Sequence, residues 1–205
     1  MGKGSTTTRR RRRTPAEAEH EILDAAEGFL RKRPLRELTI DEVMSETSLS
    51  RPAFYVYFRD RHELVLRLIE QLAGELMDMS ARWLRGSGDP REDLRAAIDG
   101  VVSAYARHGP VLRAYADAAA DDPSVEETYR GLVERFVDAT ASHIRAETRS
   151  GVIKGLNARR TAAALVWMNE RYLSHCLGTE PQLRPRDVAE TLYNIWLRTL
   201  YASSD

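Results

Sequence analysis

The fold is decided by one stretch of the chain, Thr39–Phe58, with the sequence TIDEVMSETSLSRPAFYVYF. Its first part predicts a short helix, because Thr39 can cap the helix and Glu42 follows three residues later, as in a capping box. Ser50 can cap a second helix, and Pro52 fits its first turn because a proline there loses no hydrogen bond. The stretch therefore predicts two short helices joined by a tight turn.

The second of these helices has an aromatic anchor and a free face. Phe54 and Phe58 are four residues apart, so they share one side of a helix and can hold it against the body of the protein. The side chains left to point largely away are Arg51, Ala53, Tyr55 and Tyr57. A short helix held from behind, with an arginine and two tyrosines free, is typical of the reading helix of a helix-turn-helix motif.

The string SRPAFYVYFRDRHEL, residues 50–64, resembles the junction of the third and fourth helices in TetR-type transcriptional regulators. In that family a turn led by serine or arginine precedes a Phe-Tyr-x-x-Phe helix, and here an acidic cap follows at Asp60. The alternative is that the four aromatic residues only form a packing cluster. The resemblance implies an all-α fold and double-stranded operator DNA as the partner.

We expect the motif to touch DNA in two ways. Phosphate contacts are expected from a threonine and two tyrosines, Thr39, Tyr55 and Tyr57. Base edges are expected to be approached from the start of the second helix, by Arg51, Pro52 and Ala53. The expected DNA-binding set is completed by Ser50 and Arg61. Phosphate contacts position the protein and give affinity, whereas base contacts give specificity.

Charge is distributed unevenly although the 205 residues have no net charge. Residues 1–61 hold 13 basic against 10 acidic side chains, and the remainder holds 18 against 21. Five consecutive arginines stand near the N-terminus: Arg9, Arg10, Arg11, Arg12 and Arg13. Such a run repels itself and is expected to form a disordered arm that tracks phosphates or enters a narrow minor groove. The alternative is a solvated tail.

The composition favours a cytoplasmic protein. Hydrophobic residues make up 42% of the chain, and no apolar run approaches the roughly 20 residues needed to cross a membrane. The N-terminus has no apolar region behind its charges, so we expect neither a secretory signal nor a membrane partner. The single cysteine, Cys176, excludes an internal disulfide and suits a reducing compartment.

The rest of the chain is predicted to be helical throughout. Thr14 and Glu17 form a capping box for the first helix, and a long helix follows the cap at Asp60 as far as Trp83. Gly109-Pro110 is expected to end a further helix, which brings the total to nine. Nine is also the number of helices in TetR-type regulators.

Three parts of the chain follow from this prediction. Residues 1–13 form the basic arm, residues 14–61 the DNA-binding domain with its helix-turn-helix at 39–58, and residues 62–205 a ligand-binding and dimerisation domain. The last two predicted helices, 157–177 and 185–201, are apolar beyond a single stripe and so need two partners. In the family this pair forms a four-helix bundle between two copies, which implies a homodimer. The alternative is thick packing within one monomer.

The larger domain is rich in aromatic residues, and large rings often line a cavity. WMNER at 167–171 and NIW at 194–196 resemble the ethionamide-regulator (EthR-like) branch of the family, which implies a long apolar tunnel for a small apolar ligand. By that match Asn169 is the polar anchor and Trp196 a ring at the tunnel's end. The other expected lining residues are Leu94, Ile98, Val101, Tyr105, Val133, Phe136 and Trp167. An asparagine of that branch is replaced by Val166, so we expect a different or less polar ligand. For each aromatic, ordinary core packing is the alternative.

Enzymatic chemistry has little support in the sequence. The five histidines are scattered without the i, i+4 spacing of a metal site, and there is no glycine-rich phosphate loop or nucleophile elbow. We therefore expect no catalytic residue, no metal and no cofactor. The sequence predicts a ligand-responsive transcriptional repressor. The alternative is a helical carrier or sensor of apolar ligands that acts through a protein partner, which salt-dependent DNA binding would distinguish.

Overall fold

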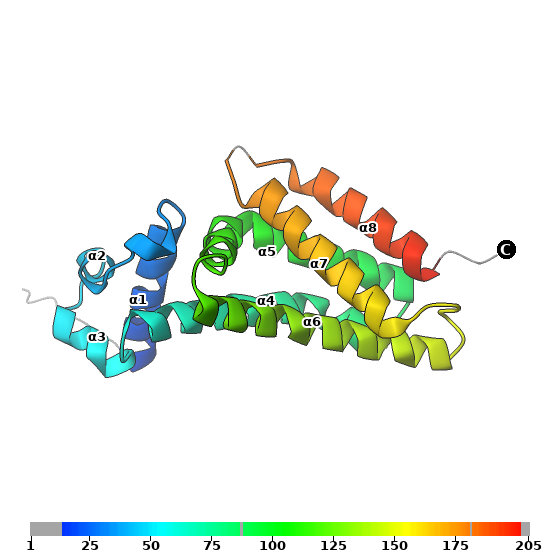
Figure 1. Ribbon diagram of the computed structural model, residues 1–205, viewed down its shortest axis with the longest axis horizontal. Helices are drawn as coiled ribbons and strands as arrows, with labels where there is room; N and C mark the ends of the chain where they lie inside the picture. Colours follow the sequence, from blue (N-terminus) through cyan, green and yellow to red (C-terminus); the bar gives the residue numbers. More distant parts are fainter. Residues whose placement is uncertain (1–13, 87, 181, 202–205) are drawn as a thin grey trace, which may run out of the picture.

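A computed structural model describes residues 14–86, 88–180 and 182–201. Within these ranges the chain forms eight α-helices and one 3-10 turn and has no strand, which confirms the all-α prediction (Figure 1). The five arginines of the predicted arm lie outside the described residues. The elements are α1 (Pro15–Leu30), η1 (Leu35–Glu37), α2 (Ile40–Ser45), α3 (Arg51–Tyr57), α4 (Arg61–Arg85), α5 (Pro90–Ala118), α6 (Pro123–Arg149), α7 (Ala158–Leu177) and α8 (Pro185–Tyr201).

Helix caps set the boundaries of the N-terminal elements. At α1 the capping box is complete, because Glu17 N–H donates to Thr14 Oγ1 at 3.2 Å and Thr14 N–H donates to the Glu17 carboxylate at 2.8 Å. At α2 the box is half formed. Thr39 accepts from Glu42 N–H at 3.2 Å, but the Glu42 carboxylate binds the Thr39 hydroxyl and Arg33 instead of the backbone.

The aromatic anchor of α3 is confirmed. Phe54 and Phe58 are almost completely buried, with their ring centroids 5.5 Å apart. They join a core that the first helices build with the start of α4, and that core also contains Val111 and Tyr115 of α5. The helix-turn-helix and the larger part of the chain are therefore packed against each other through α1, α4 and α5.

The predicted break at Gly109-Pro110 is wrong, and this accounts for the missing ninth helix. Pro110 lies inside α5, where it cannot donate to the carbonyl of Ala106 one turn earlier. The side-chain amide of Gln182 donates to that carbonyl instead, at 3.4 Å. Gly109 is buried so closely against the end of α7 that an added Cβ would lie 2.4 Å from Leu177 O. Tertiary contacts with the α7–α8 connection thus hold the helix continuous.

The second core lies among α4, α5, α6, α7 and α8. In Figure 1 α7 crosses diagonally between α6 and α8, while α4 runs from this core toward the N-terminal helices. The fully buried residues of this second core include Leu94, Ile144, Leu173 and Leu192. None of the described helices combines the length and the apolar composition that a membrane span requires.

Candidate DNA-binding face and ligand cavity

Helix α3 lies at one extreme of the molecule, opposite the end where α8 finishes (Figure 1). Its inner side is fixed by Phe54, and its outer side carries Tyr55 and Val56, which are 51% and 75% exposed. Phe54 also meets the Tyr55 ring edge-on at 5.4 Å between centroids. The helix is thus anchored on one side and presents the other to solvent.

Arg51 is not free, contrary to the expectation from sequence. Its Nε lies 2.5 Å from Asp41 Oδ1 of α2, and its guanidinium stands 5.9 Å from the centre of the Tyr55 ring. The hydrogen bond to Asp41 raises the pKa of Arg51 above its usual value. Both partners are exposed, at 57% and 73%, so water screens the pair and it can exchange for another anion.

The other residues expected to contact DNA differ in their exposure and in their hydrogen bonds. Thr39 is exposed and caps α2, whereas Ser50 occupies the cap position of α3 without a side-chain hydrogen bond to the helix. Arg61 donates from Nη1 to the backbone oxygen of Leu38 at 3.0 Å, which ties α4 to the start of α2. Of the other three residues, Pro52 is exposed, whereas Ala53 and Tyr57 are half-buried.

Two ties that hold the motif were missed by sequence reasoning. Glu21 of α1 accepts from the backbone N–H of Ser48 at 2.6 Å and from its hydroxyl at 2.8 Å, which fixes the turn between α2 and α3. Arg67 of α4 donates to Glu19 at 2.9 Å. The paired residues are 27 and 48 positions apart, so no local spacing could have revealed them.

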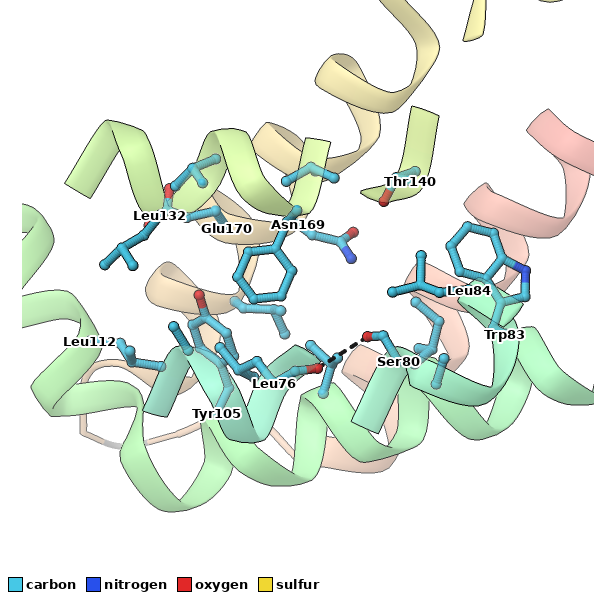
Figure 2. A pocket seen from close by; sticks show the side chains of 18 of the residues that line it. Leu76, Ser80, Trp83, Leu84, Tyr105, Leu112, Leu132, Thr140, Asn169 and Glu170 are labelled. Carbon is cyan, nitrogen blue, oxygen red and sulfur yellow. Dashed lines mark hydrogen bonds between the residues drawn. The ribbon is translucent and has the colours of Figure 1, made fainter. Parts of the chain in front are cut away.

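A cavity of about 140 Å³ lies inside the larger core, between α4 and the later helices (Figure 2). Eight of the nine residues expected to line a ligand site do line this cavity: Leu94, Ile98, Val101, Tyr105, Val133, Phe136, Asn169 and Trp196. Trp167 does not line it, and instead packs edge-on against Tyr129 with 6.0 Å between centroids. Val166, which stands where the EthR-like branch has a second asparagine, is part of the wall.

Helix α4 supplies the part of the wall that the sequence did not indicate. Its apolar stripe looks like that of any amphipathic connecting helix, yet six of its residues face the cavity: Ile69, Ala73, Leu76, Ser80, Trp83 and Leu84. Ser80 turns its hydroxyl back onto the carbonyl of Leu76 at 3.2 Å, so it adds little polarity to the wall (Figure 2). Wall residues on the other helices were also missed from the sequence, namely the polar Thr140 and Glu170 and the apolar or aromatic Ala97, Leu112, Tyr115, Tyr129, Leu132 and Leu173.

One end of the cavity is closed by a buried polar network. Trp83 Nε1–H donates to the hydroxyl of Tyr201 at 2.9 Å, and that hydroxyl donates to Glu147 at 2.7 Å. His143 Nε2 lies 3.2 Å from the same carboxylate. Burial opposes ionisation of Glu147, but the hydrogen bonds from His143 and Tyr201 outweigh it and hold the pKa of the carboxyl below its usual value. The network joins α4, α6 and α8.

Asn169 connects this end to the middle of the cavity. Its Oδ1 accepts a 2.9 Å hydrogen bond from Trp196 Nε1, and Trp196 meets the Trp83 ring edge-on at 5.5 Å. The amide nitrogen of Asn169 has no hydrogen-bond partner among the described residues. The site therefore combines an apolar wall with a few fixed polar groups, as ligand sites in proteins commonly do.

Comparison with known proteins places both parts of the chain. Residues 22–68 match the family described as bacterial regulatory proteins, tetR family, and residues 94–202 match the C-terminal domain of the transcriptional regulator EthR. The HTH-type transcriptional regulator EthR of Mycolicibacterium smegmatis is 30% identical over 190 residues, which covers 90% of this chain and 87% of that protein. The chain belongs to the TetR family, in its EthR-like branch.

The EthR of Mycobacterium tuberculosis agrees, at 30% identity over 188 residues that cover 89% of this chain and 87% of the relative. Among solved structures, a putative TetR-family transcriptional regulator from Syntrophomonas wolfei has a TM-score of 0.78 at 14% identity, covering 90% of this chain and 95% of the other. That likeness supports the fold. The family assignment makes this chain a DNA-binding transcriptional regulator, which is the role predicted from α2 and α3.

Proposed function

We propose that this TetR-family protein is a cytoplasmic homodimeric repressor, without catalytic activity, that a small apolar ligand releases from its operator. The observation that carries the proposal is the double role of α4. One end of this helix contributes Leu64 and Leu68 to the core behind the helix-turn-helix, and its later turns form one wall of the cavity. Ile69 belongs to both. A ligand that displaces the α4 wall therefore acts on the element that carries the reading helices.

The size of the cavity supports a conformational response. About 140 Å³ is close to the volume of an engineered cavity known to bind benzene, whereas pockets that hold drug-sized ligands measure about 300–1,000 Å³. A ligand much larger than one ring must therefore push the lining side chains apart. Because protein interiors are close-packed, such a displacement moves whole helices. Coupling is reciprocal, so operator and ligand weaken each other's binding.

Dimerisation through α7 and α8 is supported by their surfaces. Apolar side chains that the monomer covers only partly stand one turn apart on each helix: Met168 and Tyr172 on α7, and Tyr193 and Leu197 on α8. A two-fold pairing of these helices would cover them and would place two copies of α3 on two half-sites of the operator. Within the dimer, the DNA contacts of each copy are those predicted from Thr39 to Arg61.

Filling the cavity by mutation tests the proposal without knowledge of the ligand. Val101→Trp adds a large ring to a wall of the cavity, and we expect it to weaken operator binding while the melting temperature stays within a few degrees of wild type. Val152→Trp adds the same ring at a residue that is 47% exposed, and serves as the matched control. Operator affinity is measured by fluorescence anisotropy with DNA fragments from the region beside the gene, which is first searched for a palindrome. A strongly destabilised Val101→Trp protein with wild-type operator affinity would show that the space is ordinary core.

A further inference from the structure

The end of the cavity opposite Trp83 carries a buried carboxylate whose hydrogen bonding is incomplete. In Figure 2 Glu170 and Tyr105 lie at this end, while Trp83, Leu84 and Thr140 lie at the other. The Glu170 side chain is 9% exposed, and its Oε1 accepts from Ser174 Oγ at 3.0 Å. Its Oε2 is buried and accepts no hydrogen bond within the described part of the chain.

Among the described residues, one cation lies within ion-pair distance of Glu170, and it does not satisfy that oxygen. Arg171 follows Glu170 in α7 and places its Nε 3.7 Å from Oε2, which is beyond hydrogen-bond distance. The Arg171 side chain is 70% exposed, so water competes for its charge. The buried oxygen and the solvated guanidinium are therefore poorly matched, and a better donor would have to come from inside the cavity.

Two tyrosines of the cavity wall stand around the same carboxylate. The Tyr129 hydroxyl is buried and, among the described residues, makes no hydrogen bond of normal geometry. Burial raises the pKa of Tyr129 above its usual value, and the negative charge of Glu170 adds to the rise. The pKa of Tyr105 is raised by the same two causes, in the same order. Both phenols therefore stay protonated and polar beside an acceptor-only group.

A buried carboxylate that lacks donors is costly, and structures keep such groups where something else completes them. The phenol hydroxyls of the wall are neutral donors, and among the described residues the wall contains no lysine, arginine or histidine that could match the charge of the carboxylate. We infer that the cavity takes ligands with a protonated amine on an apolar body, the ammonium donating to Glu170 Oε2 beside the Tyr129 hydroxyl. This inference rests on the proposed function, because it names the ligand class of the same cavity.

Three probes with one skeleton test the inference: 2-phenylethylamine, 2-phenylethanol and phenylacetate, which carry a cationic, a neutral and an anionic head. Binding to the full-length protein is followed at pH 7 by calorimetry and by tryptophan fluorescence, since Trp83 and Trp196 line the site. For wild type we expect the amine to bind about tenfold or more tightly than the alcohol, as for a hydrogen bond to a charged group. Phenylacetate should bind most weakly.

Glu170→Gln keeps the shape of the side chain and removes its charge. In this variant the amine should fall to within about threefold of the alcohol, while the affinity for the alcohol changes little. Glu126→Gln removes a charge from a side chain that is 57% exposed and outside the cavity wall, and should keep the wild-type preference. If Glu170→Gln fails to fold, the amine preference is tested instead with Tyr129→Phe and with the order in which wild type binds the three probes.

The outcomes separate this inference from the proposed function. Equal binding of amine and alcohol to wild type, or tighter binding of phenylacetate, would overturn the amine preference and leave the cavity as a site for neutral or acidic ligands. Binding of none of the three probes would overturn the inference as well. If Val101→Trp then also behaved as a core substitution, the ligand-responsive function would fail with it.

Discussion

Trp196 donates a 2.9 Å hydrogen bond from its indole Nε1 to Oδ1 of Asn169. The bond joins α8 to α7 at the edge of the cavity, and Trp196 is only 4% exposed. Asn169 is therefore both a wall residue of the cavity and the partner of a buried donor. Its oxygen is occupied, which leaves the amide nitrogen as the group that could meet a ligand.

Asn169→Leu tests the structural half of this double role. With no partner visible in the sequence, the substitution would be expected to leave stability unchanged or higher. The bond to Trp196 reverses that expectation, because the variant leaves a buried indole N–H unpaired and should lower the free energy of unfolding by about 1–3 kcal/mol. A double-mutant cycle with Trp196→Phe in urea unfolding should give a coupling of about 1 kcal/mol. A raised stability for Asn169→Leu would show that the bond contributes nothing.

Gly109→Ala and Gly74→Ala should have opposite effects although both glycines lie inside helices. At Gly74 of α4 an added Cβ meets nothing within 4 Å, so alanine should stabilise by about 0.5–1 kcal/mol through helix propensity. At Gly109 the same atom would lie 2.4 Å from Leu177 O, and the α5–α7 contact must open. Thermal melting of the two variants provides the comparison. A stabilised Gly109→Ala would mean that α5 and α7 separate freely.

Glu147→Gln should change how stability depends on pH. The pKa of Glu147 is depressed in the folded protein, so the carboxylate stabilises the fold at neutral pH, and this contribution is lost as pH falls through the folded pKa. The melting temperature of wild type should therefore exceed that of the variant at pH 7, with the gap closing below the usual glutamate pKa of about 4.3. The exposed Glu126→Gln, measured over the same pH range, is the matched control. If the difference in melting temperature between wild type and Glu147→Gln did not depend on pH, the charge of Glu147 would contribute nothing and only the shape of the side chain would matter.

The sequence predicted correctly those features that depend on residues close together in the chain. Capping at Thr14 and burial of Phe54 and Phe58 depend on residues three or four positions apart, which the sequence displays directly. The break at Gly109-Pro110 was predicted wrongly because Gln182, 76 positions from Ala106, takes over the carbonyl that proline leaves free.

The same distinction governs the candidate site. Eight of nine expected wall residues were found through resemblance to a family, whereas the α4 wall and Glu170 were not. An apolar stripe shows that one face of a helix is shielded from water. It does not show whether that face packs against other side chains or borders a cavity. The pairing of Arg51 with Asp41, ten positions away across the α2–α3 turn, was hidden for the same reason.

Arg51 and Asp41 should affect operator binding in different directions. Arg51→Ala should weaken binding to the operator by about tenfold or more and relax preference at one base position. Asp41→Asn removes an anion from the DNA-facing side and releases the arginine, so binding should be equal or tighter. Anisotropy titrations with the operator and single-base variants distinguish these effects. Operator affinity unchanged by Arg51→Ala would show that the arginine reads no base.

Tyr57→Phe should act on affinity without acting on sequence preference. The residue is half-buried against the N-terminal core, so its ring is kept and only the hydroxyl is lost. A phosphate contact carries no sequence information, and its loss should weaken operator and random duplexes by a similar factor. Competition titrations with both duplexes measure that factor. A selective loss on the operator alone would place the hydroxyl near a base.

Deletion of residues 1–13 tests the basic arm, which lies outside the described residues. The deletion removes Arg9–Arg13 and leaves the capping box at Thr14 intact, so the melting temperature should hardly change. If the arginines contact phosphates, fewer counterions are released on binding, and the slope of log affinity against log salt should flatten by about 0.9 per lost contact. Replacing the five arginines by glutamine in the full chain is the matched control, because it keeps the arm's length. An unaltered slope in both variants would show that the run is a solvated tail and that the helix-turn-helix alone carries the electrostatic part of binding.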